Sequence, residues 1–560
     1  MKPAPKFQPL PRWLAPALIA LAAVFLIGLL STEFADTDAW WHLATGRYIA
    51  THHRLPAPDP FSYTTAGAKP AYPGEEATRR FNLTHEWLAQ TGLYVIYVVG
   101  GFPALVLWKG FLLALLCLTV GHVARLRTGS TLWGVAASLA AASLAVEFAH
   151  DRPSILSFVF TVLFIAIFEE DRWLWLLPPL ALVWANCHGG FFLGWVVCGA
   201  YAVPALLRRR WRVLLAAGGA VLLSLANPNG IAVLGTILRY RQSAMQSSLM
   251  EWTRADLWGP PWPFVAMLYG SAVVLALSWK RVRLSDWLLF AAFAAAAISA
   301  FRNEMLIGLL APILIASYWP WKRVLRMPPP LPVVAHYAAG ALLAGGIVWG
   351  IASGRFFQLR AAEWRFPSGA ANFLRANGIR APLFNTYEYG GYLIWRGESV
   401  FIDGRALSES VFQDYRIVMG TPAGDPRRTQ MLDRYGIGAI VMNSFEYNSG
   451  TLYPLVLDLA QPESGWTLAY EDPQALVFLR QLPPGVAAMS KSRVIDHLEA
   501  ECRLHVERDP EFSLCARTLA NLLLKSGART RGRAMLSLYL EHPYGDDPEA
   551  RQAYMDLVRR

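Results

Sequence analysis

Asp36 and Asp38 stand two residues apart, directly after an apolar segment, in the stretch ADTDAWWHLATGRY (35–48). Two carboxylates at this spacing can hold a divalent cation such as Mg²⁺ or Mn²⁺, or one of them can act as a general base. Trp40 and Trp41 follow at once, and rings of this kind are favoured at a membrane interface. Because a lone D-x-D pair also suits a solvated loop, its meaning depends on the rest of the chain.

The composition points to a membrane protein with a water-soluble tail. The 560 residues are 54% hydrophobic and 16% charged, with 22 tryptophans, which is unusual for a soluble protein. Residues 13–353 are a series of apolar runs, whereas the sequence from 354 onward has ordinary soluble composition. The net charge of +11 is spread over short loops between apolar runs, so it indicates membrane topology and not nucleic-acid binding.

Apolar length predicts about eleven membrane spans, because a helix needs roughly 17–25 residues to cross the hydrocarbon core. The runs are 13–31, 103–124, 131–147, 154–168, 173–186, 190–207, 213–227, 262–279, 285–301, 303–319 and 333–352. A shorter patch, 88–100, fits an interfacial helix that leads into the second span. The first run lacks a small-residue cleavage site, so we expect it to be a retained span.

Basic residues cluster in every second loop, which predicts a cytoplasmic N-terminus, an extracytoplasmic tail and an inner-membrane location. These residues are Lys2, Lys6, Arg12, Arg125, Arg127, Arg172, Arg208–Arg210, Arg212, Lys280, Arg281, Arg283, Lys322, Arg323 and Arg326. The same alternation places the polar motifs on the opposite, outer face. They are DTD (36–38), HEW (85–87), AHDRPS (149–154), ANCHGGF (185–191), NPNG (227–230), EW (251–252) and FRNE (301–304). Ionisable groups at span ends are costly to desolvate, so their convergence suggests a working site.

The tail reads as two parts. From about 366 to 480, strand-like APLFNT, SVFID, IGAIVMN, WTLAY and ALVFLR alternate with helix-like SGAANFLRANG, RRTQMLDRYG and LYPLVLDLAQ, an α/β pattern. Four helical pieces follow, near 490–507, 511–526, 528–541 and 546–558, which could pair as in tetratricopeptide repeats. We therefore expect a membrane domain at 1–353 with a long outer loop at 32–90, an α/β domain at 354–485 and a helical region at 486–560. Cys502 and Cys515 could pair in an extracytoplasmic tail.

Taken together, these motifs resemble a group of bacterial GT-C-type membrane proteins. The resemblance rests on DTDAWWHLATGRYIATHHRLPAPDPFSYT, HEWL, RPSILS, WANCHGGFFLG, NPNG, EW and YEYGGYLIW…VFIDGR, and covers residues 33–405. GT-C glycosyltransferases are integral membrane enzymes that use sugars carried on polyprenyl phosphates. The chain is also distantly similar to the catalytic subunits of oligosaccharyltransferases, whose W-W-D-Y-G signature has the counterpart TYEYG (386–390) here. Because Glu replaces Asp and the aromatic residues differ, this similarity does not predict N-glycosylation.

The resemblance implies roles for particular residues. Asp36 or Asp38 would be the catalytic base or a metal ligand, Asp151 a second acidic ligand, and Glu251 a further catalytic acid from a later outer loop. Arg152, Arg302 or Arg405 would hold the lipid-linked phosphate, since a guanidinium suits phosphate oxygens. The acceptor-side cleft would contain Glu388, Tyr389 and Asp403. The chemistry would be attack of an acceptor hydroxyl on the anomeric carbon, with inversion.

Four residues remain open between a binding role and a structural one. His42, His85 and His188 could act as ligands or proton carriers, with Glu86 beside His85, but each could also be a structural group.

The sequence therefore predicts a membrane glycosyltransferase that uses a polyprenyl-phosphate sugar, with an unidentified glycan, lipid or protein as acceptor. A non-catalytic scaffold in envelope assembly and a transporter of lipid-linked glycans are the alternatives. A transporter would be expected to carry broken helices with ionisable groups near mid-membrane.

Overall fold

The computed structural model describes residues 11–239, 245, 250–320, 331–446, 449–542 and 546–559. The predicted topology charges Lys2, Lys6, Lys322, Arg323 and Arg326 lie outside these residues. The chain forms two compact units. Unit 1 comprises residues 1–36, 45–57 and 77–361, and unit 2 comprises 37–44, 58–76 and 362–560. The division falls between Asp36 and Thr37, so the two aspartates of the D-x-D pair belong to different units.

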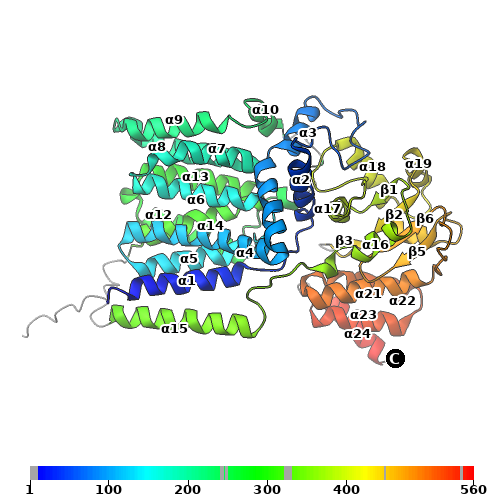
Figure 1. The fold of residues 1–560 in the computed structure, drawn as a ribbon. Helices are drawn as coiled ribbons and strands as arrows, with labels where there is room; N and C mark the ends of the chain where they lie inside the picture. Colours follow the sequence, from blue (N-terminus) through cyan, green and yellow to red (C-terminus); the bar gives the residue numbers. More distant parts are fainter. Residues whose placement is uncertain are drawn as a thin grey trace, which may run out of the picture. The chain divides into compact units, whose positions relative to one another are not determined.

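Unit 1 is a helical bundle whose long helices lie side by side (Figure 1). Its helices are α1 (Leu14–Leu30), α4 (Trp87–Thr128), α5 (Thr131–Ala145), α6 (Ser154–Glu170), α7 (Leu177–Cys187), α8 (Phe192–Leu207), α9 (Trp211–Ser224), α10 (Ala232–Arg239), α12 (Trp262–Leu277), α13 (Leu284–Ser299), α14 (Met305–Tyr318) and α15 (Leu331–Ala352). Two helices, α2 (Ala39–His52) and α3 (Glu75–Thr84), cross the division between the units. Each of the eleven predicted apolar runs coincides with helix in this structure.

Three helical stretches among the described residues are long and apolar enough to cross a membrane, judged by length and composition. They are Glu75–Thr128, Gly189–Leu207 and Pro332–Ala352. Six further apolar helices are shorter, at 10–17 residues. The unit thus has the helices of a membrane protein, while the count of eleven spans stays a prediction.

Helix α4 consists of two arms that meet at Gly101. The backbone there has φ 62° and ψ −154°, a region open essentially to glycine alone, and Pro103 follows. The first arm, residues 87–100, runs across the ends of the bundle helices, and the second arm, 102–128, runs along them (Figure 1). The first arm coincides with the helix predicted at 88–100, and its location at the membrane interface stays a prediction.

A buried network of charged side chains links helix ends on the side of the bundle opposite the polar motifs. The Arg127 guanidinium lies 2.8 Å from Glu169 and 2.9 Å from Asp286, so it links the ends of α4, α6 and α13. The Tyr318 hydroxyl donates to Asp286 over 2.5 Å and adds α14. Breaking one partner of such a buried network costs roughly 3–5 kcal/mol. The network therefore fixes the helix ends that lie opposite the polar motifs.

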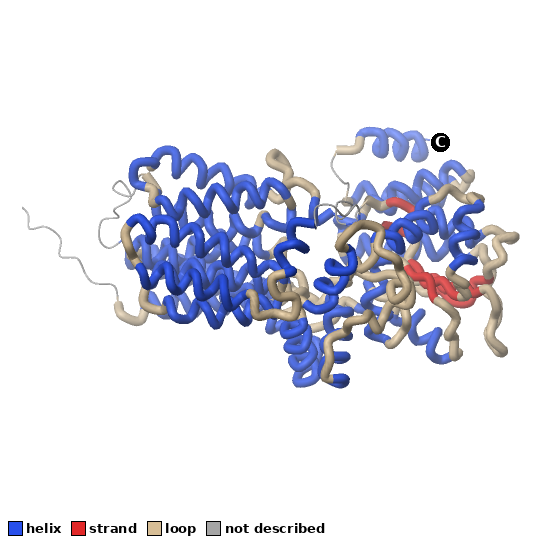
Figure 2. Tube along the Cα trace, turned by 90° about the horizontal axis from the view of Figure 1, so that it is seen from above, coloured by secondary structure: helices blue, strands red, loops and turns tan. Residues whose placement is uncertain are grey.

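Unit 2 combines a small sheet with helices around it (Figure 2). Its elements are α16 (Ser368–Ala376), β1 (Leu383–Asn385), α17 (Tyr387–Arg396), α18 (Glu409–Gly420), α19 (Pro426–Arg434), β2 (Ala439–Met442), β3 (Phe445–Glu446), β4 (Thr451–Leu452), α20 (Pro454–Ala460), β5 (Thr467–Glu471), β6 (Leu476–Leu479), α21 (Arg493–Arg508), α22 (Leu514–Lys525), α23 (Arg529–Glu541) and α24 (Pro548–Arg559). The sheet order is β1-β2-β6-β5, with β1 and β2 parallel and the other pairs antiparallel. The register pairs Leu383 with Ala439 and Ile440 with Phe478.

The α/β prediction for the tail is confirmed apart from one strand. SVFID (399–403) forms only an isolated bridge at Val400 because its partner is Ser62 of the first loop and not a strand of the sheet. The four predicted C-terminal helices are present as α21–α24, and Cys502 and Cys515 form a disulfide between α21 and α22.

The first loop supplies part of the core of unit 2. The Trp40 ring packs 4.9 Å from the Phe366 ring and 4.8 Å from the Tyr392 ring, and both Trp40 and Trp41 are buried. The expectation that Trp40 and Trp41 lie at a membrane interface is therefore wrong, since a ring enclosed by protein has no face left for lipid headgroups.

The Gly101 backbone yields a first prediction. Gly101→Ala should lower the unfolding free energy by about 1–3 kcal/mol, because a Cβ is strained in this conformation. The measurement is the midpoint of thermal unfolding of the purified protein in lipid. Gly199→Ala is the matched control, since Gly199 is helical and a Cβ there meets nothing within 4 Å. Equal midpoints for the two variants would contradict the strained turn.

Candidate active site

Three of the predicted site residues meet at the end of the bundle that carries the polar motifs. Asp36 follows α1, Arg152 lies in the loop between α5 and α6, and Glu251 lies in the 3-10 turn Met250–Trp252. Arg152 contacts both of the others: its Nε donates to Asp36 Oδ2 over 2.5 Å and its Nη1 donates to Glu251 Oε1 over 2.6 Å. Arg302, in the turn Phe301–Asn303, lies 3.6 Å from the second Glu251 oxygen.

A second ion pair lies beside this group. Lys109 Nζ is 2.8 Å from Asp151 Oδ1, and both side chains are buried. Asp151 Oδ2 accepts the backbone N–H groups of Ala35 and Asp36 at 3.0 and 3.4 Å, so this carboxylate fixes the chain that presents Asp36. We define the ionic cluster as Asp36, Lys109, His150, Asp151, Arg152, Glu251 and Arg302. Its three carboxylates and three permanent cations balance in formal charge.

Lys109 is a member of the cluster that the sequence motifs do not contain. Its signal in the sequence is a single lysine within the apolar run 103–124, where an ionisable group is expensive unless it is paired or functional.

The surroundings shift the pKa values of the cluster in different directions. Burial alone would raise the pKa of Glu251, but Arg152 and Arg302 lower it below its ordinary value, so this carboxyl is ionised. Burial raises the pKa of Asp151, against the opposing effect of Lys109. Loss of hydration and the neighbouring Arg152 cation lower the pKa of His150, which lies 3.9 Å from Asp36. The cluster thus contains both ionised acids and an imidazole that is readily neutral.

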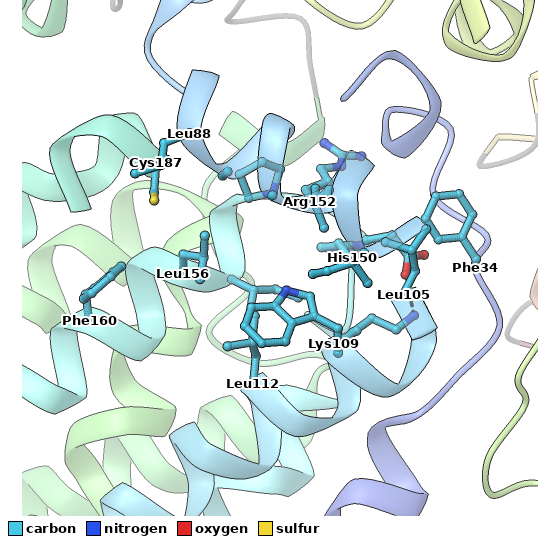
Figure 3. A pocket seen from close by; sticks show the side chains of 18 of the residues that line it. Phe34, Leu88, Leu105, Lys109, Leu112, His150, Arg152, Leu156, Phe160 and Cys187 are labelled. Carbon is cyan, nitrogen blue, oxygen red and sulfur yellow. Dashed lines mark ion pairs between the residues drawn. The ribbon is translucent and has the colours of Figure 1, made fainter. Parts of the chain in front are cut away.

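A pocket of about 270 Å³ opens beside the cluster (Figure 3). Both arms of α4 line it, together with α6, α7 and the loop before α6. Lys109, His150 and Arg152 stand at one end, whereas Leu88, Phe160 and Cys187 stand at the other. The remaining lining residues are largely aliphatic or aromatic. The pocket therefore offers an apolar chamber with a charged end.

Glu86, His85 and His188 form a neighbouring group in unit 1. Glu86 Oε1 lies 3.3 Å from His85 Nε2 and 3.6 Å from His188 Nε2. The Trp184 indole N–H donates to Ser157 Oγ over 2.8 Å, and Ser157 Oγ lies 2.7 Å from His188 Nδ1. These contacts bring the HEW and ANCHGG motifs together.

Glycine is required next to this group. A Cβ on Gly189 would lie 2.8 Å from the Phe81 ring, and one on Gly190 would lie 2.6 Å from Ser157 Oγ. The glycines of the ANCHGG motif therefore permit the close approach of Phe81 and Ser157.

Asp38 and His42 belong to unit 2, whereas the residues of the ionic cluster belong to unit 1. Asp38 is packed so closely on Gly404 that a Cβ at position 404 would clash with its carboxylate. His42 is buried, and its ring lies 3.6 Å from that of Trp41.

The predicted acceptor-side residues are buried within unit 2. Arg405 is paired with Asp59 at 2.6 Å and Asp403 at 2.7 Å, and all three side chains are almost fully buried. Glu388 accepts a hydrogen bond from the Tyr453 hydroxyl at 3.1 Å, and burial raises its pKa. The Tyr389 hydroxyl donates to the Gln474 carbonyl. In this structure these groups hold the fold of unit 2. Contact of Glu388, Tyr389 or Asp403 with an acceptor, and of Arg405 with a lipid-linked phosphate, stays a prediction.

The predicted metal ligands do not form a complete metal site. Among the described residues, no group of three or more His, Cys, Asp or Glu side chains is arranged to hold a metal ion. Asp36 and Asp151 each face a cation, and Asp38 belongs to the other unit. Dependence on Mg²⁺ or Mn²⁺ stays a prediction, and we derive no catalytic step from a metal.

The fold is shared with glycosyltransferases of the GT-C class. No family model and no curated protein sequence matches the chain. Among solved structures, it is similar to the Archaeoglobus fulgidus oligosaccharyltransferase tethered to an acceptor peptide containing the NVT sequon. The TM-score is 0.52 and the identity 10%, over 85% of this chain and 75% of that chain.

A second structure of that organism holds the archaeal oligosaccharyltransferase AglB with an inhibitory peptide and a dolichol-phosphate. It gives a TM-score of 0.50 and 11% identity, over 86% of this chain and 77% of that chain. ArnT from Cupriavidus metallidurans, bound to undecaprenyl phosphate, gives a TM-score of 0.47 and 13% identity, over 84% and 98% of the two chains. The chain therefore has a GT-C-type fold, which it shares with the archaeal oligosaccharyltransferase.

The Lys109–Asp151 pair yields a second prediction. Lys109→Met should lower the unfolding free energy by roughly 3–5 kcal/mol, because it leaves a buried carboxylate without its cation. The double variant Lys109→Met/Asp151→Asn should recover part of this loss, since the amide oxygen can still accept the Ala35 N–H. Denaturant unfolding of the three proteins measures the coupling. A double variant no more stable than Lys109→Met alone would refute it.

Glu304, the last residue of the FRNE motif, yields a third prediction. Its carboxyl is fully buried, and neither oxygen has a hydrogen-bond partner among the residues that the structure describes. A buried polar group without a partner costs about 1–3 kcal/mol, so this side chain lowers the stability of the fold.

Glu304→Met should remove this cost, because Met has a similar length and no polar atom to satisfy. We expect its unfolding free energy to exceed that of the wild type by about 1–3 kcal/mol. Glu304→Gln, which keeps polar atoms buried at the same position, is the matched control and should gain less. Unfolding midpoints of the three proteins provide the test, and a Met variant no more stable than the Gln variant would contradict the prediction.

Proposed function

We propose that this chain is a GT-C-type glycosyltransferase that moves a sugar from a polyprenyl phosphate to an acceptor hydroxyl at the outer face of the cytoplasmic membrane. The observation that carries the proposal is the pocket beside the ionic cluster. Its aliphatic and aromatic walls suit an isoprenoid chain, and Lys109, His150 and Arg152 at one end suit a phosphate. The shared GT-C fold supports the same assignment.

The reaction assigns a role to each charged group. Asp36 would take the proton of the acceptor hydroxyl while the hydroxyl oxygen attacks the anomeric carbon from the face opposite the phosphate. The bond between that carbon and the phosphate oxygen breaks, and the lipid phosphate leaves with the bonding electrons. Arg152 would stabilise the charge that develops on the phosphate, and inversion follows from attack on the opposite face.

Glu251 would position the two arginines of the ionic cluster. It lies between Arg152 and Arg302, and its lowered pKa keeps it ionised. Glu251 would hold the guanidinium groups of Arg152 and Arg302 in place, and a phosphate oxygen of the substrate would replace one of its contacts with them.

The topology favours an outer-face site. The basic loops predict a cytoplasmic N-terminus, and the Cys502–Cys515 disulfide suits an oxidising compartment outside the cytoplasm. The donor and the acceptor would then bind at the outer face of the cytoplasmic membrane. The acceptor is an unidentified glycan, lipid or protein, and no nucleic acid is involved.

Asp36 and Asp38 supply a matched pair of variants for a fourth prediction. Asp36→Asn should reduce glycosyl transfer by about 100-fold or more, because it removes the base while keeping the size of the side chain. Asp38→Asn should retain activity within a few-fold, since Asn can serve as well as Asp before helix α2. The assay uses purified protein in lipid with a panel of polyprenyl-phosphate sugars.

Loss of activity in Asp38→Asn with retention in Asp36→Asn would move the base to Asp38. Full activity in both would remove the D-x-D pair from the mechanism. A folded wild type that neither binds polyprenyl phosphate nor transfers any sugar of the panel would favour the scaffold alternative.

A further inference from the structure

The turn between α8 and α9 carries four arginines within five residues, 208–212, and we call these residues the arginine turn. Arg208–Arg210 and Arg212 are all exposed. Helix α8 begins beside the polar motifs, at Phe192, so its far end brings the arginine turn to the opposite helix ends of unit 1 (Figure 1). The stretch Gly189–Leu207 is long and apolar enough to cross a membrane. The arginine turn therefore stands where a span ends and lipid headgroups begin.

Three guanidinium groups of the arginine turn have no acidic partner among the residues that the structure describes. Arg210 is paired with Asp171 at 2.5 Å. Arg208, Arg209 and Arg212 form no ion pair within that part of the chain. The surface of the turn thus keeps three positive charges that no carboxylate of the described chain compensates.

Several other basic side chains at these helix ends are already held by carboxylates. Arg127 and Arg283 each lie 2.8 Å from Glu169, and Arg172 lies 3.1 Å from Glu170. The topology rule counts the basic residues of a loop and does not depend on whether they are paired. It therefore leaves the three unpaired groups of the arginine turn without an explanation.

The backbone of Arg209 is a second, independent observation. Arg209 follows the C-cap of α8 and has φ 52°, in the left-handed region. Glycine is the usual residue at this position, because a Cβ is strained there. A glycine would end the helix without that cost, so an arginine at this position indicates a use for its side chain.

Exposed apolar side chains flank the arginines. Trp211 lies within the turn and is 62% exposed, and Leu207 immediately before it is 75% exposed. The Arg210–Asp171 pair joins the turn to the loop before α7, where Trp175 is 64% exposed. Exposed tryptophans suit the headgroup level of a bilayer, and an exposed leucine at the end of a span suits acyl chains. The same surface therefore offers contacts for both parts of a lipid.

We propose that the arginine turn binds the headgroup of an anionic phospholipid, whose acyl chains lie along α8 and α9. Guanidinium groups match phosphate oxygens, and basic surfaces at the ends of membrane helices bind lipid headgroups. Three unpaired cations favour a lipid with two phosphates, such as cardiolipin, over one with a single phosphate. Exposed Trp211 and Leu207 favour a lipid over a soluble phosphate. The proposal is independent of glycosyl transfer, so either can fail without the other.

The first test measures cardiolipin binding to the full chain in phosphatidylcholine nanodiscs. A ligand that binds the folded state raises the midpoint of thermal unfolding, and the rise at increasing cardiolipin gives an apparent Kd. The turn variant is Arg208→Gln/Arg209→Gln/Arg212→Gln. The charge control removes three exposed arginines of unit 2 instead, Arg416→Gln/Arg529→Gln/Arg533→Gln. We expect the apparent Kd to rise by about tenfold or more in the turn variant, because charge-assisted hydrogen bonds are lost, and to match the wild type in the control.

Three results would overturn the proposal. Equal weakening in the turn variant and the charge control would mean that cardiolipin responds to total charge and not to this turn. Unchanged binding in the turn variant would exclude the arginine turn as the site. Equal stabilisation of the wild type by inorganic phosphate, in nanodiscs without cardiolipin, would identify a soluble anion as the ligand.

The second test uses the backbone of Arg209 and does not require the triple variant to fold. In phosphatidylcholine alone, Arg209→Gly should unfold at or above the wild-type temperature, because the left-handed conformation is no longer strained. With cardiolipin present, it should gain less than the wild type, so that the order of the two midpoints reverses. A variant less stable than the wild type by the same amount in both lipids would assign Arg209 to the fold alone. An equal gain from cardiolipin in both proteins would remove Arg209 from the site.

Discussion

The contact between Arg152 and the carboxylates of Asp36 and Glu251 is the interaction on which the candidate site depends. These groups come from three connections of the bundle that are far apart in sequence, and a single guanidinium fork joins them at 2.5 and 2.6 Å. An isolated charge at this depth would be expensive, so each acid of the cluster has a cation beside it. The same balance makes the cluster responsive to a phosphate, because an added anion can compete with either carboxylate for Arg152.

The geometry of α4 explains why an apolar pocket lies next to these charges. A straight helix would carry Leu88 and Leu93 away from Lys109, but the turn at Gly101 folds them toward it. Lys109 then faces Asp151 from inside the span, and Asp151 accepts the backbone N–H groups that fix Asp36. One glycine thus connects the shape of the pocket with the position of the proposed base. At the opposite helix ends, the network around Arg127 holds α4, α6 and α13 together.

Much of this could be predicted from the sequence, because membrane helices and span-end charges leave strong signals. The apolar runs located the helices, and loop alternation placed Asp36, Arg152 and Glu251 on one face, where the structure pairs them. Lys109 was missed because the run that contains it, 103–124, is apolar over nearly its whole length and is recognised only as a span. Trp40 was misassigned because a tryptophan buried in protein and one in a membrane interface have the same local sequence. Asp59 was missed because its pairing with Arg405 joins residues 346 positions apart, which no local pattern can reveal.

The central claim is that the charged end of the pocket holds a polyprenyl phosphate. Its most direct test is an experimental structure of the protein in nanodiscs with undecaprenyl phosphate. The account predicts phosphate density within hydrogen-bond distance of Arg152 or Lys109 and the first isoprene units between the two arms of α4. Phosphate density at another place, with the Asp36–Arg152–Glu251 contacts unchanged, would contradict it.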